Sequence, residues 1–291
     1  LSMFLTMIVG YIIVKIGLFK ETDSKIISNM VVYICSPCVI IDAFQIELTD
    51  DKLQGLLIAV VAAICVHIVM IGGTKLMEKP LHFNRIEKAS VIYSNSGYVL
   101  GKEWVFYTTA YNLVQTVLLW THAVGIISKK DEKNYKEIFL NPNMIAMFLG
   151  MLMFISRIRL PQVIGTCVSS FGDMISSASM LVIGMVIGNV DLKWVFRQKR
   201  PYLICFIRLI FYPVIGAVAF GVLGSMEIHP DAEYILMIVF LATAAPVAAM
   251  VTQLAQIYDQ DVKYASVINV MSVIFCIITM PCMVMLYESF F

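Results

Sequence analysis

The sequence has 291 residues, of which 60% are apolar and only 14% are charged, and its formal net charge is +1. A soluble domain of this length carries about a quarter charged residues, so the composition excludes an ordinary water-soluble globular protein. The near-zero net charge gives no indication of a nucleic-acid partner.

Long apolar stretches separated by short polar segments run along the whole chain. A helix needs about 20 apolar residues to cross ~30 Å of hydrocarbon, and outside a helix lipid leaves backbone N–H and C=O groups without partners. We therefore predict an all-α integral membrane protein with ten transmembrane helices, the first of them retained rather than cleaved as a signal peptide. The predicted spans, numbered 1 to 10 in chain order, are 1–19, 26–48, 53–77, 86–100, 104–128, 143–158, 163–190, 201–225, 232–257 and 262–289.

The loops between these spans alternate in their content of basic residues. One set of alternate loops carries 14 Lys and Arg residues, whereas the opposite set carries only four, Lys52, Lys102, Arg157 and Arg159. Because cytoplasmic loops are enriched in basic residues, we expect a multi-pass protein of the cell membrane with both termini on the extracytoplasmic side.

The chain divides into two halves of five spans each. Span 2 contains Pro37–Ile41 and span 7 contains Ser179–Ile183 at matching places, and spans 5 and 10 carry Asn112 and Asn269 at a similar depth. Since five is odd, the two halves must have opposite orientations, and inverted repeats place a substrate site near the membrane midplane. The predicted organisation is a first repeat at 1–128, a cytoplasmic linker at 129–142 and a second repeat at 143–291.

Polar or helix-breaking residues interrupt the fourth span of each half. In span 9 the run Thr243–Pro246 ends in a proline, which removes a backbone hydrogen bond and clashes with the preceding turn. In span 4 the run Ser94–Gly97 is polar and should face protein or water rather than lipid. A proline kink packed among neighbouring helices is the alternative for span 9 alone. The coincidence of two irregular segments at equivalent positions favours a functional break in both spans.

Several of these segments resemble the auxin efflux carrier family. The matching segments occur in the family's order over nearly the whole chain, and they are Ser94–Tyr98, Trp104–Tyr107, Tyr111-Asn112, Leu118–Thr121, Leu140–Pro142, Gly172-Asp173 and Ala244–Ala248. The resemblance implies two inverted repeats in which spans 4 and 9 are broken and cross each other. It also implies transport of small organic anions such as auxin or dicarboxylates. In related folds spans 1, 2, 6 and 7 form a scaffold, here expected to dimerise through spans 2 and 7, and spans 3–5 and 8–10 move against it as an elevator.

One departure from the family pattern concerns span 4. The family continues after its Ser-Asn-x-Gly-aromatic run with a Gly-x-Pro stretch, whereas here Tyr98–Gly101 leads directly into Lys102. The stretch 86–100 then reaches only about 22 Å at 1.5 Å per residue, which is too short for a full crossing. We interpret this as residues missing from the sequence near Val99–Leu100 rather than as a truncated helix.

The expected substrate site combines the two breaks with polar residues of spans 5 and 10. A broken helix directs free N–H groups into the protein, and these favour an anion without a buried lysine. The basic residues within spans, Lys15 and Arg208, are interpreted as snorkelling side chains, with a substrate or gating charge as the alternative for Arg208. For Asn112 and Asn269 an interhelical hydrogen bond is an equal alternative. The predicted substrate-binding residues are Ser94, Asn95, Ser96, Gly97, Asn112, Thr243, Ala245, Pro246 and Asn269.

Candidates for proton or ion coupling are few. Asp42 lies late in span 2 and Asp173 early in span 7, and either could carry a proton or be an interfacial carboxylate. The Cys35–Cys38 pair is interpreted as small side chains in a membrane helix rather than as a redox motif. We expect no disulfide, metal or cofactor, and the sequence has no nucleotide-binding motif or nucleophile–base pair.

These patterns favour a secondary carrier of small organic anions, such as carboxylates or auxin-like acids, that works by elevator-type alternating access. The expected partners are the anion and the lipid bilayer. The alternative is a non-transporting membrane sensor that uses the same fold to bind a ligand. An intramembrane enzyme would need paired acids or a His/Glu cluster at matching depth, and the sequence has neither.

Overall fold

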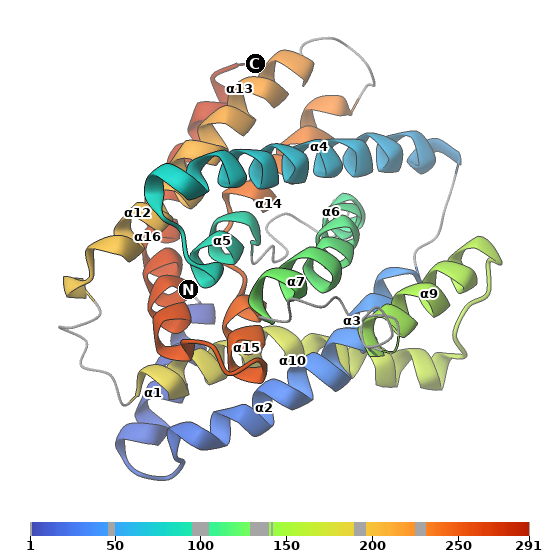
Figure 1. Ribbon diagram of the computed structural model, residues 1–291. Coiled ribbons are helices and arrows are strands. Elements are labelled where there is room, and N and C mark those ends of the chain that lie inside the picture. The colour runs from blue at the N-terminus through green and yellow to red at the C-terminus, as the bar shows by residue number, and fades with distance from the viewer. Residues whose placement is uncertain are drawn as a thin grey trace. The chain divides into compact units, whose positions relative to one another are not determined.

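The computed structural model describes residues 2–45, 50–94, 105–128, 140, 142–188, 196–224 and 231–290. Within these ranges the regular structure is helical (Figure 1), except for one isolated β-bridge. The first half of the chain contains α1 (Ser2–Lys15), η1 (Glu21–Asp23), α2 (Ser24–Met30), η2 (Val31–Cys35), α3 (Ser36–Ala43), α4 (Asp50–Leu81), α5 (Arg85–Ile92), α6 (Val105–Leu118), η3 (Leu119–Ala123) and α7 (Val124–Ile127). The second half contains α9 (Pro142–Ile155), α10 (Gln162–Ile187), α12 (Lys199–Phe206), η4 (Ile207–Phe211), α13 (Tyr212–Gly224), α14 (Ala232–Ala244), α15 (Ala249–Ile257) and α16 (Val262–Glu288).

Many of these helices have the length and composition of membrane spans. Within the described residues six are long and apolar enough to cross a membrane, namely Glu21–Ala43, Gln54–Leu81, Ala110–Ile127, Gln162–Ile187, Lys199–Val222 and Val262–Glu288. Shorter apolar helices cover Leu5–Lys15, Pro142–Ile155 and Ala232–Ala244. The all-helical, multi-pass class expected from the composition is therefore confirmed, whereas the ten-span inverted repeat stays a prediction.

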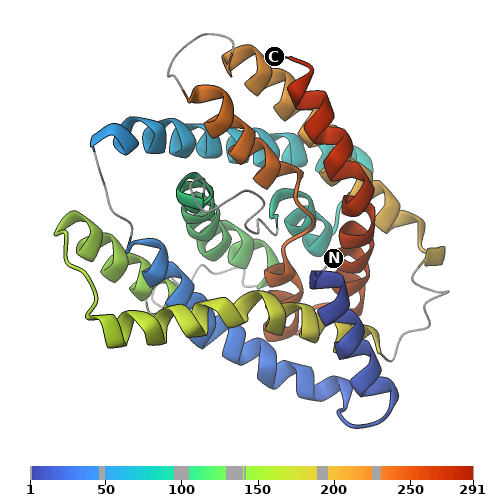
Figure 2. The ribbon, with the colours of Figure 1, turned by 180° about the vertical axis from the view of Figure 1, so that it is seen from behind.

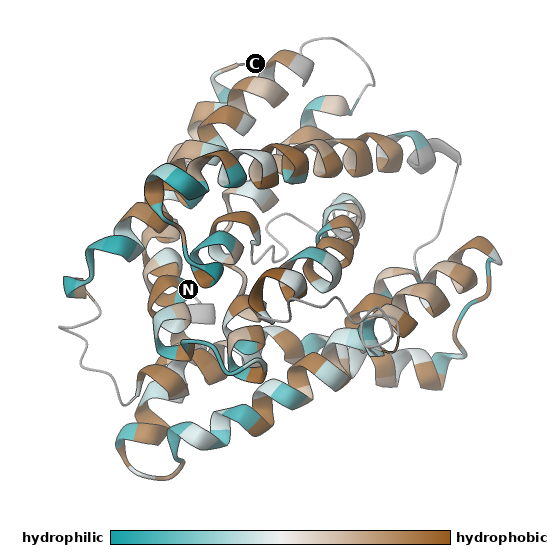
Figure 3. Ribbon diagram, in the orientation of Figure 1, coloured by the Kyte–Doolittle hydropathy of each residue, from teal (hydrophilic) through white to brown (hydrophobic). Residues whose placement is uncertain are grey.

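Helix α4 shows why the membrane class is visible in the sequence. Most of its residues are apolar, as the colouring of its ribbon shows (Figure 3). One face packs inside the protein through Ala59, Ala63 and Met70. The opposite face exposes large apolar side chains at helical spacing, Leu57, Val61, Ile64 and Ile68. A helix that is apolar on both faces suits a lipid-facing position, because lipid receives the face that a soluble protein would make polar.

Three helical segments, η2, η3 and η4, are π-helical turns within longer helices. Two of them end two residues before a proline, η2 before Pro37 and η4 before Pro213. A proline cannot donate to the carbonyl four residues earlier and clashes with it, and a wider turn relieves this conflict without ending the helix. Such π-turns occur frequently at functional sites.

The chain forms two compact units, of which unit 1 comprises Leu1–Glu47, Thr116–Arg197 and Ala249–Val267. Within unit 1, α1, α2 and α3 pack along α10, and α9 packs on α3, as both views show (Figures 1 and 2). Helix α15 packs on α2 and α10. Unit 1 therefore has the long helix α10 as its centre.

Glycines bring α1 and α10 close together. A Cβ atom at Gly10 would collide with the backbone carbonyl of Leu181, and one at Gly184 would collide with that of Met7. Small residues at a crossing allow two membrane helices to approach closely and gain van der Waals contact along their backbones. Both glycines are thus required for this packing.

Unit 2 comprises Leu48–Gln115, Gln198–Ala248 and Ile268–Phe291. Within it, α4 packs on α5 and α14, α14 packs on α13, and α5 packs on α12 and η4. The Tyr287 ring of α16 stacks on Phe240 of α14, with ring centroids 5.1 Å apart. The candidate functional site described below is built entirely from residues of unit 2.

Candidate functional site

Span 9 is interrupted where the sequence predicts it. Helix α14 ends at Ala244, Ala245 is extended with φ −67° and ψ 156°, and α15 begins only at Ala249. Pro246 explains this geometry, because the residue before a proline is driven from the α region towards extended backbone. The predicted break is therefore confirmed, and the alternative of a kinked but continuous helix is wrong.

The first helical segment of span 4 ends close in space to the break in span 9. Helix α5 begins behind the N-cap Asn84 and ends at Ile92, and Tyr93 is extended with φ −97° and ψ 132°. Ser94 then forms an antiparallel β-bridge with Val247, and the Ala248 N–H donates to the Tyr93 carbonyl at 3.0 Å. Two extended segments from opposite halves of the chain thus meet and hydrogen-bond inside unit 2.

The junction is the place where Tyr93-Ser94 meets Val247-Ala248. Gln115 of α6 holds the span 4 side of this junction. Its Oε1 accepts from the Ser94 N–H at 3.1 Å and from the Ser94 hydroxyl at 2.8 Å, and its Nε2 donates to the Ser94 carbonyl at 2.9 Å. The hydroxyls of Tyr111 and Ser94 lie 3.1 Å apart. One amide side chain therefore satisfies both backbone groups of a buried residue that has left its helix, as buried polar groups require.

Two residues of α16 hold the span 9 side in the same manner. The Val247 N–H donates to the Ser272 hydroxyl at 3.1 Å, and the Val247 carbonyl accepts from Asn269 Nδ2 at 2.9 Å. Asn269 lies at the junction, where its amide nitrogen holds the backbone, as the hydrogen-bond alternative expected, and a role in substrate binding stays a prediction. The Asn269 Oδ1 is buried and has no hydrogen-bond partner among the described residues.

The predicted site residues divide into three groups. Ser94, Ala245 and Asn269 are buried in or beside the junction, together with Pro246 and Thr243. The Thr243 hydroxyl donates to the Val239 carbonyl of its own helix at 2.8 Å. Asn112 occupies a half-buried position on α6. The remaining calls, Asn95, Ser96, Gly97 and the missing segment near Val99–Leu100, lie outside the described residues.

The sequence reasoning missed two residues that build the junction, Gln115 and Ser272. Gln115 lies four residues after Tyr111, and Ser272 lies three residues after Asn269. These spacings place each pair on one helix face. A search for further polar residues at that spacing from Tyr111 and Asn269 would have found both.

Arg208 corrects one prediction. It lies in the π-turn η4 and is completely buried, with 0% of its surface exposed, so the interpretation as a snorkelling side chain is wrong. Its Nη1 contacts the Met70 sulfur at 3.6 Å and the Val91 carbonyl at 3.5 Å. The Tyr111 hydroxyl lies beside the guanidinium group. Unit 2 therefore contains a buried cation next to the junction.

His67 of α4 is a packed polar group, with 1% of its surface exposed. Its Nδ1 lies 2.8 Å from the Ala63 carbonyl, and its ring lies 5.1 Å from the Tyr111 ring between centroids. A carbonyl can only accept, so Nδ1 carries the proton and the neutral ring presents Nε2 as an acceptor. Nε2 is buried and has no partner within the described part of the chain.

The two carboxylates considered for coupling both lie in unit 1. Asp42 of α3 and Asp173 of α10 are exposed and close enough to repel each other. Helices α3 and α10 pack together near these residues, since Gly172 contacts Val39. A coupling role for either aspartate stays a prediction.

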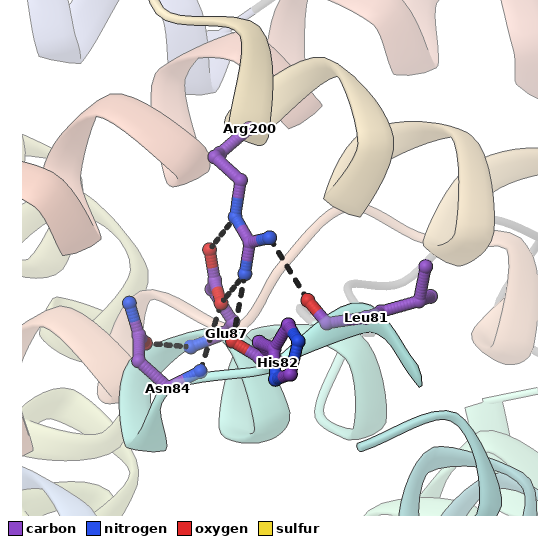
Figure 4. A network of polar contacts seen from close by, with 5 residues as sticks. All are labelled: Leu81, His82, Asn84, Glu87 and Arg200. Carbon is purple, nitrogen blue, oxygen red and sulfur yellow. Dashed lines mark hydrogen bonds and ion pairs between the residues drawn. The ribbon is translucent and has the colours of Figure 1, made fainter. Parts of the chain in front are cut away.

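A network at the start of α5 holds the helix that leads to Ser94 (Figure 4). Asn84 and Glu87 form a capping box, in which each side chain accepts from the other residue's backbone N–H at 2.8 Å. Arg200 of α12 donates through Nε and Nη2 to the two oxygens of Glu87, at 3.0 and 2.8 Å. It also donates to the carbonyls of Leu81 and His82 at the end of α4. These contacts fix α5 to its neighbours.

This architecture defines the class of the protein. Many apolar helices long enough to span a bilayer, combined with interrupted helices whose extended segments meet inside the fold, are typical of secondary transporters. Among the described residues no cluster of His, Cys, Asp or Glu side chains is arranged to hold a metal ion.

Comparison with known proteins identifies the family. The family model described as membrane transport protein matches residues 1–138 and 127–284, so the chain belongs to this family, which is the auxin efflux carrier family. The resemblance drawn from the sequence is thereby confirmed, and the protein is a multi-pass membrane transport protein. The family is one of transporters and not of enzymes. A search of curated proteins gives no match.

Proposed function

We propose that the protein is a secondary carrier of small organic anions, such as carboxylates or auxin-like acids. The observation that carries the proposal is the hydrogen-bonded meeting of Tyr93-Ser94 with Val247-Ala248 in unit 2. Interrupted helices of this type present backbone groups and half-helix ends to a substrate near the membrane midplane. Membrane transport is the activity of the family, and the anion is our inference.

The helix ends at the junction support an anionic substrate. The side chains of Ser94, Thr243 and Asn269 lie there too, but each already donates to a protein group and so holds the local structure. Asn95 and Ser96 follow Ser94 directly in the sequence. N–H groups released at a helix break favour negative charge by about 0.3–1 kcal/mol at exposed helix ends and up to ~2 kcal/mol where the site is partly buried. A carboxylate would gain from such a site, whereas a cation would not.

We propose elevator-type alternating access on ten transmembrane helices arranged as two inverted repeats. The division into two compact units agrees with this mechanism in part. Spans 1, 2, 6 and 7 lie in unit 1 and both junction segments lie in unit 2, but α7, α15 and the start of α16, which belong to the spans expected to move, also lie in unit 1. The proposal places the scaffold in spans 1, 2, 6 and 7 and both chain termini on the extracytoplasmic side. Exposed apolar residues in the first half of α10, such as Val163 and Phe171, support a homodimer through spans 2 and 7.

Transport assays test the proposal. Purified protein is reconstituted into proteoliposomes, and uptake of a panel of carboxylates and their amides is measured with and without imposed proton or sodium gradients. We expect uptake of acids but not of amides, and a gradient dependence would identify the coupling ion. Binding of an acid without any uptake would instead support the ligand-binding sensor. Equal uptake of acids and amides would refute an anion carrier.

Asn95→Ala tests the site. Loss of one neutral hydrogen-bonding partner of the substrate costs about 1–3 kcal/mol, and we therefore expect carboxylate affinity to fall roughly five- to hundredfold. Thr121→Ala is the matched control, because Thr121 is exposed and its hydroxyl donates to the Val117 carbonyl of its own helix. Unchanged affinity in the Asn95 variant would exclude Asn95 from the site.

A further inference from the structure

Arg208 is a buried cation without a counter-ion in the described part of the chain. All of its surface is covered, and no carboxylate of the described residues forms an ion pair with it. Arginine does not lose its proton in proteins. An unpaired charge inside a membrane protein is costly and marks a functional site by default. The charge therefore calls for an anionic partner.

The guanidinium atoms define the shape of that partner. Nη1 is directed to the Met70 sulfur and the Val91 carbonyl, whereas Nε and Nη2 are buried and have no hydrogen-bond partner among the described residues. Nε and Nη2 lie along one edge of the planar guanidinium group, and their N–H bonds run parallel. This pair of parallel donors, called the fork below, matches the two oxygens of one carboxylate.

The same unit contains a formed example of this pairing. Arg200 uses Nε and Nη2 to bind both oxygens of the buried Glu87 carboxylate, at 3.0 and 2.8 Å (Figure 4). In Arg208 the same two atoms are without partners. The difference is that no acidic side chain of the described residues forms an ion pair with Arg208, which leaves these two donors available for the carboxylate of a bound anion.

The position of Arg208 connects it to the junction. Its guanidinium lies beside the Tyr111 hydroxyl, which lies 3.1 Å from the Ser94 hydroxyl, and Ser94 is bridged to Val247. Arg208 itself sits in the π-turn η4 before Pro213, and η4 packs on α5 and α14, the two helices that end at the junction. The cation and both broken helices are thus parts of one packed cluster.

We propose that Arg208 binds the carboxylate of the transported anion side-on through Nε and Nη2, and so determines the preference for acids. This inference rests on the proposed carrier function and names the group that recognises the charge. It replaces the expectation that helix ends and neutral amides alone bind the anion. The fork selects a planar carboxylate over an amide, because an amide offers one acceptor oxygen and its NH₂ group opposes the second N–H.

Access to the site requires side chains to move. Nε and Nη2 have no contact with solvent, so a carboxylate reaches them only when neighbouring groups shift. Met70 covers Nη1 with its sulfur, and methionine is an unbranched and adaptable side chain. A closed site of this kind suits a carrier, which must shield its substrate between openings to the two sides.

The test is equilibrium binding of radiolabelled phenylacetate, benzoate and indole-3-acetate, each against its amide, to purified protein in nanodiscs. Arg208→Met keeps a long side chain and removes the charge. Arg208→Lys keeps the charge and removes the fork. Arg200→Lys is the matched control, because it removes an equivalent fork that is used for packing. Thermal unfolding of every variant is followed in parallel.

We expect acid affinity to fall about ten- to hundredfold in Arg208→Met, and less in Arg208→Lys, whereas amide affinity stays unchanged. Because the removed charge is unpaired, Arg208→Met should fold and be at least as stable as the wild type. Arg200→Lys should keep the acid preference.

Three other results would overturn the proposal in different ways. Wild-type protein that binds no acid of the panel better than its amide refutes the anion carrier and this inference together. Wild-type protein that prefers acids, with the preference intact in Arg208→Met, refutes only the role of Arg208. Strong destabilisation of Arg208→Met with an unchanged ratio of acid to amide affinity would assign Arg208 to packing against the end of α5.

Discussion

Gln115→Leu is the sharpest test of how the junction is held. The substitution preserves side-chain volume closely, so the cost of a cavity or of overpacking stays small. It removes the three hydrogen bonds that Gln115 makes with the N–H, the hydroxyl and the carbonyl of Ser94. Both backbone groups of Ser94 are buried, and the substitution would remove their hydrogen-bond partner among the described residues.

The magnitude follows from the number of groups left unpaired. Each buried backbone donor or acceptor without a partner costs about 1–3 kcal/mol, and the two groups of Ser94 together give about 2–6 kcal/mol. Since the total stability of a folded protein is only about 5–15 kcal/mol, such a loss is large. The lower part of the range applies if the Tyr111 hydroxyl, 3.1 Å from the Ser94 hydroxyl, moves to compensate.

The assay is reversible unfolding in mixed micelles, followed by circular dichroism, together with phenylacetate binding on the same samples. Thr121→Val is the control, because it also removes a side-chain hydrogen bond, but one on an exposed face. We expect the control to remain within about 0.5 kcal/mol of the wild type. A Gln115→Leu protein with wild-type stability and wild-type binding would refute the idea that Gln115 holds the junction.

Two further predictions concern packing within each unit. Gly184→Ala should destabilise unit 1 by about 1–3 kcal/mol, because its methyl group meets the Met7 carbonyl, whereas Gly72→Ala has open space and should be neutral or stabilising by up to about 1 kcal/mol in thermal unfolding. Equal effects at the two glycines would contradict the close crossing of α1 and α10. Arg200→Lys should lower the unfolding temperature, because a lysine cannot serve both oxygens of Glu87, whose side chain is 1% exposed. An unchanged unfolding temperature would show that the two-point contact between Arg200 and Glu87 adds no stability.

Local chemistry explains what the sequence predicted well about the site. Pro246 dictates an extended Ala245 by steric conflict with its direct neighbour, so the break in span 9 needs no tertiary information. Ser94 was also predicted from local sequence, because it belongs to a polar run within an apolar span. Asn269 was found because a polar amide within a long apolar span is rare enough to be noticed.

Residues that act through distant partners could not be found in this way. Gln115 and Ser272 became part of the site only because the fold brings them to Ser94 and Val247. Their roles depend on which face of α6 or α16 meets the junction, and an apolar span does not reveal its inner face when lipid tolerates the same side chains as the protein interior. The amphipathic signal that orients a helix in a soluble protein is weak here.

The sequence by itself determined the membrane class, the helical character of the spans, the family and the break in span 9. These follow from rules that act within a few residues or within one span: lipid enforces backbone hydrogen bonding, and proline enforces a break. Only the tertiary structure decided whether Arg208 is buried. Its position near a span end predicted a side chain that extends to solvent, but the packing of η4 against α5 and α14 covers it completely. Burial is a property of the neighbours around a residue, and those neighbours come from other parts of the chain.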